Sequence, residues 1–237
     1  MDEIVKLADE LHEICLAAAN SKYIAKRPAI HSFEDGKISI QKSEDQLGGY
    51  LIAIGASTGG TEAIKDLLID LPANVPPIII TQHIPPVFSA AFADRLNTLC
   101  KFKVKEASDG DELMPGKAFV APGGKHIRLK RQGARRFIQL TEDAPVNRFR
   151  PSVDYMFDSV SDDDCDKVIA ILLTGMGADG AQGLLKLRRK NAHTVAQDES
   201  TSIVYGMPKV AKDIGAAIDV LPLDLIAGKI ANFLNKK

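Results

Sequence analysis

Short runs of almost purely apolar residues, separated by stretches with helical periodicity, constrain the fold of this chain more than any other feature. The clearest runs are LIAIG at 51–55, PIIITQ at 77–82 and VIAILLTG at 168–175. A strand that is apolar on both sides must be buried on both sides, which is typical of parallel sheets covered by helices on each face. We therefore predict an α/β fold with a doubly wound, mainly parallel sheet.

The other predicted elements continue this alternation. Further strands are predicted at 102–107, 118–122, 136–140, 193–197 and 217–221, and helices at 60–70, 87–100, 151–161, 179–190, 206–214 and 222–235. Between 102 and 140 the strands are closely spaced and separated by PGK and GGK turns rather than by helices. This spacing predicts an antiparallel β-hairpin or meander inserted into the α/β pattern.

The first 48 residues have a different character. Within 1–20, Ile4, Leu7, Leu11 and Ile14 recur at three- and four-residue spacings, which predicts an amphipathic helix. Residues 21–48 are polar and have no sustained period, so we interpret them as a linker that leads into a domain spanning 49–237. A single amphipathic helix needs a partner for its apolar side, so we expect it to belong to an interface or to the end of another domain.

Composition narrows the possible settings and partners. The formal net charge is −1, which gives no global reason to expect nucleic acid or an anionic membrane as a partner. The three cysteines are widely spaced without a CxxC pair, so neither a disulfide framework nor a zinc site is indicated. The N-terminus does not resemble a signal peptide, and no apolar run reaches the roughly 18 residues of a membrane span. We expect a cytoplasmic protein with no membrane insertion.

The first apolar run leads directly into GASTGG, which contains Ser57. This stretch lacks the GxGxxG spacing of dinucleotide-binding loops and the GxxxxGK[ST] of P-loops. It does match G-x-S-x-G between a strand and a helix, the context in which this motif exposes a nucleophilic serine. An anion-binding turn and a plain helix N-cap remain as alternatives for Ser57.

A nucleophilic serine needs a histidine base, and the chain has five histidines. His83 ends the strand at 77–82, so it should lie at the same sheet edge as the serine. His193 opens its strand and should lie at the opposite edge. His126 follows a GGK turn and is expected to be an exposed strand residue, while His12 and His31 lie in the N-terminal helix and linker.

The base in turn needs an orienting carboxylate. The strand at 168–175 runs into TGMGADGA, which brings Asp179 to the same edge as Ser57 and His83. Asp179 could also serve as the N-cap of the helix that follows. The set Ser57, Asp179 and His193 would have the chain order of α/β-hydrolases, and it is the second candidate triad.

With these residues identified, the chain from about residue 50 to its end resembles the catalytic domain of the chemotaxis protein-glutamate methylesterases, the CheB family. The matching stretches are IAIGASTGGTEAI, PIIITQHIPPVFSAAFADRLN, VKEASDGDELMPGKAFVAPGGKH, PVNRFRPSVDYMFDSV, ILLTGMGADGAQGL and VYGMPKVA. The resemblance implies that Ser57 is the nucleophile, His83 its base and Asp179 the orienting acid. It also implies that the backbone amides of Thr58 and Met176 form the oxyanion hole.

The same resemblance implies a substrate and partners. Family members hydrolyse glutamate γ-methyl esters on the cytoplasmic helices of chemoreceptors to glutamate and methanol, and some deamidate glutamines, without a metal or organic cofactor. Arg148 and Arg150 could contact an acidic receptor helix or could simply be solvated, and Met207 could shape the pocket or belong to the core. A non-catalytic receptor-binding module of the same fold is the alternative function.

The N-terminal segment departs from the family pattern. Family members usually carry a receiver domain there, and 48 residues are too few for one. The helix at 1–20 and the linker resemble the last receiver helix and the interdomain linker. We therefore expect either a fragment of a longer protein, with a receiver domain in cis, or a short homologue.

Overall fold

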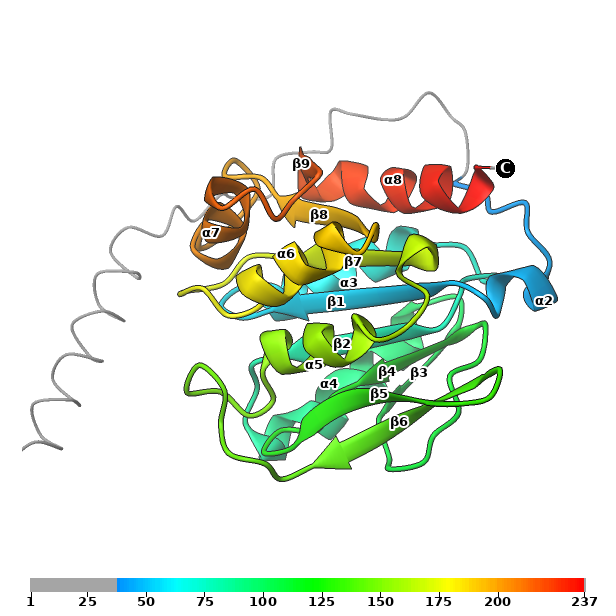
Figure 1. Ribbon diagram of the computed structural model, residues 1–237, viewed down its shortest axis with the longest axis horizontal. Coiled ribbons are helices and arrows are strands. Elements are labelled where there is room, and N and C mark those ends of the chain that lie inside the picture. Colours follow the sequence, from blue (N-terminus) through cyan, green and yellow to red (C-terminus); the bar gives the residue numbers. More distant parts are fainter. Residues whose placement is uncertain (1–37, 237) are drawn as a thin grey trace, which may run out of the picture.

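The computed structural model describes residues 38–236, which are built around a seven-stranded sheet (Figure 1). All of its neighbouring strands pair in parallel, in the order β3-β4-β2-β1-β7-β8-β9. The strands are β1 (Leu51–Ala56), β2 (Ile78–Gln82), β3 (Lys103–Glu106), β4 (Lys117–Val120), β7 (Val168–Leu172), β8 (His193–Gln197) and β9 (Asp219–Leu221). The predicted parallel α/β fold is confirmed.

The side of the sheet to which the chain adds strands changes at the central strand β1. From β1 the chain adds strands outward on one side, through β2 to β4 and β3, and then returns to place β7 on the other side of β1. In open α/β sheets such a switch point leaves a crevice outside the carboxyl ends of the two strands, where ligands bind. The loops after β1 and β7, which contain Ser57 and Asp179, start at this point.

Helices cover both faces of the sheet (Figure 1). Alternate residues of β1 belong to two separate clusters of buried side chains, with Ile52 and Ile54 in one and Leu51 and Ala53 in the other. The first cluster includes α3 (Gly60–Asp70), α4 (Pro86–Leu99) and α8 (Leu223–Asn235), and the second includes α5 (Val153–Val160), α6 (Ala181–Arg189) and α7 (Met207–Asp213). A short 3₁₀ turn, η1 (Cys165–Lys167), precedes β7.

The antiparallel hairpin is formed by β5 (His126–Gln132) and β6 (Arg135–Thr141) and lies at the bottom of the view in Figure 1. The predicted hairpin is therefore present, but it is shorter than the 102–140 meander that was also considered. The strands predicted at 102–107 and 118–122 instead extend the main sheet in parallel as β3 and β4, because α4 covers them as a crossover helix. His126 was expected in a strand of this hairpin, but the bounds of β5 were not predicted.

Residues 38–48 pack against the main domain. Ser43 caps the one-turn helix α2 (Glu44–Leu47) in a capping box with Gln46. Ile40 and Leu47 are buried in the first core cluster. The boundary at residue 49 stays a prediction, and the predicted helix at 1–20 lies outside the described residues. Within 38–236, no helix is long and apolar enough to cross a membrane.

Candidate active site

Ser57 lies where β1 ends, one turn before helix α3. The N-cap of α3 is Gly59, with a φ of 79° and no side-chain cap bond, so Ser57 does not have the N-cap role considered as an alternative. Its Oγ lies 3.0 Å from Nδ1 of His83 instead. The turn is closed by the Gly60 N–H, which donates to the Ser57 carbonyl at 2.7 Å. The turn thus presents the hydroxyl to the imidazole.

A close backbone approach by Gly175 leaves Ser57 little freedom. A Cβ at position 175 would lie 2.7 Å from Cβ of Ser57 and 2.4 Å from Sδ of Met207, closer than van der Waals contact allows. The Ser57 N–H donates to the Thr174 carbonyl at 3.0 Å. The loops after β1 and β7 are therefore in direct contact at the serine.

His83 bridges the serine and the carboxylate. Its Nε2 lies 2.8 Å from Oδ2 of Asp179, while its Nδ1 faces Ser57. The ring stacks on Phe149, with centroids 3.6 Å apart and planes 11° from parallel. The neighbouring Gln82 donates from Nε2 to the carbonyls of Ser57 and His83, at 2.9 and 3.0 Å. One buried amide thus ties the serine turn to the strand that carries the histidine.

Asp179 is held at the N-terminus of helix α5. It is 2% exposed, and its Oδ2 accepts from the Val153 N–H at 2.6 Å. Its Oδ1 accepts from the Ser152 hydroxyl at 2.8 Å and from the Asp154 N–H at 3.3 Å. Helix N-termini favour a negative charge because their N–H groups lack partners within the helix. Asp179 therefore caps α5 and not α6, whose N-cap is Gly180.

These contacts determine the charge of Asp179. Burial by itself would raise its pKa, but hydrogen bonds from His83, Asn147 and the Val153 N–H outweigh burial and hold the pKa below its usual value. The carboxylate therefore remains ionised at neutral pH. An ionised carboxylate on one ring nitrogen keeps that nitrogen protonated, which leaves the other nitrogen free to accept the serine proton.

A second carboxylate, Asp154, lies behind the first. The Asn147 side-chain amide donates to Oδ1 of Asp179 at 2.7 Å and to Oδ2 of Asp154 at 2.8 Å. Asp154 also accepts from the Gly183 N–H at 2.7 Å. Its pKa is raised, chiefly by burial and also by the charge of Asp179. Asp154 therefore supports the site from behind and contacts neither His83 nor Ser57 through a hydrogen bond.

The predicted oxyanion-hole amides belong to the two loops that meet at Ser57. Neither the Thr58 nor the Met176 N–H donates a hydrogen bond to another protein group within residues 38–236. The segment before Met176 is held by Gly206 and Met207, whose N–H groups donate to the Gly175 carbonyl at 3.2 and 2.8 Å. Unpaired, fixed N–H groups beside a nucleophile are the donors that such a hole requires.

Of the other described histidines, His193 lies at a different edge of the sheet, while His126 lies next to the cluster, where its Nδ1 accepts from the N–H of Ser152. His193 is at the amino end of β8, where its Nε2 is 2.7 Å from Oδ2 of Asp219 and its ring stacks on Phe233. His126 was expected to be exposed but is fully buried, because its ring stacks on Tyr155 at the start of β5. His12 and His31 lie outside the described residues.

A shallow groove of ≈ 320 Å³ opens beside the imidazole. Arg148 and Arg150 are both exposed on its rim, and the Arg150 guanidinium donates to the carbonyls of Glu142 and Asp143 at 2.9 and 3.2 Å. Met207 is fully buried in the core below Gly175. The groove is lined by His83, Ile84, Pro85, Arg148, Phe149, Arg150 and Pro151.

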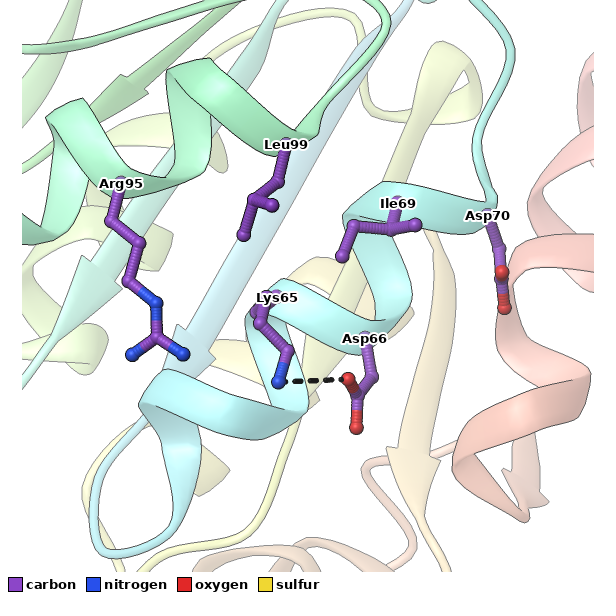
Figure 2. A pocket seen from close by; sticks show the side chains of 6 residues that line it. All are labelled: Lys65, Asp66, Ile69, Asp70, Arg95 and Leu99. Atoms are coloured by element: carbon purple, nitrogen blue, oxygen red, sulfur yellow. Dashed lines mark ion pairs between the residues drawn. The ribbon is translucent and has the colours of Figure 1, made fainter. Parts of the chain in front are cut away.

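A larger hollow of ≈ 510 Å³ lies between α3 and α4 (Figure 2). Its walls are mostly charged side chains, among which Lys65 and Asp66 form an ion pair. None of the predicted site residues lines this hollow. In the described part of the chain, no group of three or more His, Cys, Asp or Glu side chains is arranged to hold a metal ion.

A parallel α/β fold with a hydrogen-bonded serine, histidine and aspartate at the carboxyl ends of its strands defines a class, that of proteins with serine-hydrolase geometry. The family follows from comparison with known proteins. The family model for CheB methylesterase matches residues 52–230, and the chain belongs to that family.

Relatives and a solved structure agree with this assignment. The chain is 52% identical over 180 residues to protein-glutamate methylesterase/protein-glutamine glutaminase 2 of Pseudomonas aeruginosa, covering 76% of this chain and 52% of that protein. It is 53% identical over 180 residues to protein-glutamate methylesterase/protein-glutamine glutaminase 1 of Anaeromyxobacter dehalogenans, covering 76% of this chain and 51% of that protein. The chain thus spans about half the length of the curated relatives it matches. The crystal structure of the Thermotoga maritima CheB methylesterase catalytic domain matches with a TM-score of 0.76 at 39% identity, covering 78% of this chain and 98% of that one.

Sequence reasoning brought Ser57, His83 and Asp179 together but missed the side chains that hold them. Gln82, Asn147, Phe149 and Ser152 all contact a member of this set. Gln82 directly precedes His83 at the end of an otherwise apolar strand, which is a signal that could have been used. The other three lie in a loop whose path no periodic pattern predicts.

Proposed function

We propose that this chain is a protein-glutamate methylesterase that hydrolyses glutamate γ-methyl esters on chemoreceptors to glutamate and methanol. The observation that carries the proposal is the pair of contacts at His83, 3.0 Å from Oγ of Ser57 and 2.8 Å from Oδ2 of Asp179. Membership of the CheB methylesterase family supports the choice of substrate.

In the proposed reaction, the Ser57 hydroxyl attacks the ester carbonyl while Nδ1 of His83 takes its proton. Asp179 accepts the Nε2–H and stabilises the imidazolium that forms. The negative charge on the tetrahedral intermediate develops beside the N–H groups of Thr58 and Met176. Methanol leaves with the proton returned by the imidazolium, and a glutamyl ester remains on Ser57.

Water completes the cycle. His83 removes a proton from a water molecule as it attacks the glutamyl ester, and the Ser57 hydroxyl is restored as free glutamate is released. A glutamine side chain fits the same scheme, with ammonia in place of methanol. The names of relatives include protein-glutamine glutaminase, so we propose deamidation of receptor glutamines as a second activity.

We propose that the groove beside His83 receives the receptor segment next to the reacting residue. Its rim carries the positive charges of Arg148 and Arg150, which suit an acidic partner. Because Met207 is buried, we propose that it acts by supporting Gly175 from below. A cytoplasmic location and regulation by a receiver domain in cis remain proposals, and the reading frame upstream of Met1 tests the second.

The decisive experiment measures methanol released from receptor membranes whose methyl esters carry tritium. Wild-type protein should release it, and Ser57→Ala should release none. His83→Ala should lower kcat/KM on the order of 10⁴-fold, since the base is lost. Mass spectrometry of receptor peptides in the same samples measures the conversion of glutamine to glutamate.

Two matched controls interpret the result. Ser43→Ala removes the serine that caps α2, outside the site, and His193→Ala removes the histidine of the second candidate triad. Both should keep wild-type rates. Full activity of Ser57→Ala, or loss in His193→Ala but not in His83→Ala, would contradict the assignment. Saturable receptor binding without methanol or ammonia would favour the non-catalytic module.

A further inference from the structure

A strained turn lies over the site. Val146 and Phe149 exchange backbone hydrogen bonds of 2.9 and 3.1 Å, which closes a two-residue turn. Its central residues, Asn147 and Arg148, have φ values of 51° and 69°. Positive φ at both central positions is the signature of a type I′ turn, which asparagine tolerates and glycine favours. Arginine in this conformation costs about 1–2 kcal/mol.

The turn determines, first, where the Asn147 side-chain amide lies. With positive φ at Asn147, the side chain reaches back below the turn, where Nδ2 donates to both Asp179 and Asp154. Two neighbouring buried carboxylates repel each other, and one amide group shared between them offsets part of that repulsion. The amide also restrains Oδ1 of Asp179, so that Oδ2 stays aimed at His83.

The turn also determines where the Phe149 ring lies. Immediately after the turn, Phe149 stacks almost parallel on the imidazole of His83 at 3.6 Å. A flat aromatic face against a flat ring leaves the imidazole free to slide in its plane but hinders its tilting. It also keeps water from that face of the base.

We propose that the turn at 146–149 is a positioning device, in which Asn147 fixes the Asp179 carboxylate and Phe149 fixes the His83 ring. The two residues touch the two members of the triad that do not react covalently, so they are positioning residues and not catalytic ones. This inference rests on the proposed function, because it assigns supporting roles within the same site.

A positioning role predicts a specific kinetic signature. Asn147→Ala should lower kcat on the order of 100-fold with little change in KM, because a misplacement of about 1 Å is enough to cost that much. Phe149→Leu should lower kcat about 10-fold, and Phe149→Tyr should restore most of it, since the aromatic face is retained. The Asn147→Ala loss should appear in the methylated-receptor assay as a loss in kcat. Because Phe149 also lines the proposed receptor groove, its positioning role is tested by measurements without receptor.

Two measurements that need no receptor separate this inference from the proposed substrate. One is the rate at which a fluorophosphonate probe phosphonylates Ser57. The other is the low-field proton NMR signal of the His83–Asp179 hydrogen bond. Phe149→Leu and Asn147→Ala should slow the labelling and broaden or remove the signal, while Phe149→Tyr should preserve both. If wild type reacts with the probe but releases no methanol, the proposed substrate fails and the positioning role is still tested.

Matched variants outside the site control for loss of stability. Asn74 also uses its side-chain amide to hold another part of the chain, the Ile40 carbonyl at 2.7 Å, and Phe137 is a partly exposed ring on β6. Asn74→Ala and Phe137→Leu should keep wild-type kcat and the NMR signal. The inference is overturned if Asn147→Ala and Phe149→Leu keep both as well, or if the leucine and tyrosine variants at 149 behave alike.

Discussion

At the scale of single residues, two neighbouring aspartates show how the environment sets the charge of a side chain. Asp179 and Asp154 are both buried and share the Asn147 amide, yet their pKa values shift in opposite directions. Asp179 accepts five hydrogen bonds, and these outweigh the effect of burial. Asp154 accepts fewer, so burial dominates. In the proposed mechanism the carboxylate that orients the base must stay charged, and Asp179 is the one that the fold supplies with more donors.

The orientation of His83 also follows from its neighbours. Its Nδ1 faces Ser57 and its Nε2 faces Asp179, which is the reverse of the chymotrypsin arrangement. Either ring nitrogen can act as the base, because what matters is that the carboxylate holds the proton on the other one.

His126 leads to a prediction about pH and stability. Burial lowers its pKa from the usual 6.5, so the folded protein favours the neutral ring. Its Nδ1 accepts from the Ser152 N–H at 3.2 Å, which also requires a neutral nitrogen. A depressed histidine pKa contributes stability above the unfolded value, and this contribution is lost as the pH falls through the folded value. Acidification should therefore weaken the loop that leads into α5.

Urea denaturation at about pH 7.5 and about pH 5.5 measures this effect. The free energy of unfolding should fall between the two, and His126→Gln should reduce the fall, whatever its effect at neutral pH. The pKa of His193 is also lowered, chiefly by burial. His193→Gln should therefore remove a separate part of the fall in the free energy of unfolding. An identical pH dependence in wild type and His126→Gln would contradict the explanation.

At the scale of elements, hydrophobic periodicity in the sequence predicts most helices and strands. It does not predict features that depend on contacts between distant segments. Helix α3 was predicted with its observed bounds, because a glycine-rich turn and a clear apolar stripe delimit it. The extent of strand β5 was not predicted because HIRLKRQ is dominated by cationic residues, although Ile127 and Leu129 do alternate with them. The fold class and the three strand ends could therefore be predicted from the sequence.

The support around the site could not be predicted in the same way. Asn147 and Phe149 reach the triad through a turn with two positive φ values, and arginine at its second central position gives no hint of that conformation. Asp179 was considered as the cap of the helix that follows it, but it caps α5, which precedes it in the chain. Contacts between distant segments depend on how the elements pack, and a local pattern does not carry that information.

The contact between the β1 and β7 loops leads to a prediction at this scale. Gly175→Ala would push a methyl group against Ser57 and Met207. Overpacking of this kind typically costs about 1–3 kcal/mol, while a displaced serine should lower kcat on the order of 100-fold. A 100-fold loss corresponds to about 2.7 kcal/mol of barrier, similar to the expected cost in stability, so the variant should remain folded at low temperature and still be nearly inactive.

Gly48→Ala is the matched control for this substitution. Gly48 ends α2 with a φ of −59°, and a Cβ there would meet no atom closer than 3.5 Å. Methanol release and thermal unfolding of both variants test the idea. A Gly175→Ala protein with wild-type activity would show that the two loops can separate without cost.

At the scale of the whole molecule, the topology explains why the proposed catalytic residues lie at one edge of the sheet. Parallel strands all end at the same edge, and β1, β2 and β7 are adjacent in the sheet. Ser57, His83 and Asp179, far apart in sequence, therefore come together as soon as these three strands pair. Asn147 and Phe149 contact Asp179 and His83 from the loop between the hairpin strand β6 and helix α5.

The segment that enters the domain leads to the last prediction. Ile40 and Leu47 are buried in the same core cluster as α3 and α8. This segment is hydrogen-bonded to the end of α8. The Gln41 N–H donates to Oδ1 of Asn235 at 2.8 Å, and the Asn235 side-chain amide donates to the Ser39 carbonyl at 2.9 Å. We therefore expect residues 38–48 to stabilise the domain, because a cut at residue 49 would remove two core side chains, Ile40 and Leu47.

Two shortened chains test this. A chain that starts at residue 38 serves as the reference. A chain that starts at residue 49 should be less stable by several kcal/mol, because deleting one large buried side chain such as Leu47 costs about 2–5 kcal/mol. Leu47→Ala in the full chain should reproduce part of that loss, while Gln41→Ala, at an exposed position in the same segment, should not. Equal stability of the two shortened chains would instead place the boundary at residue 49, since residues 38–48 would then contribute nothing to the core.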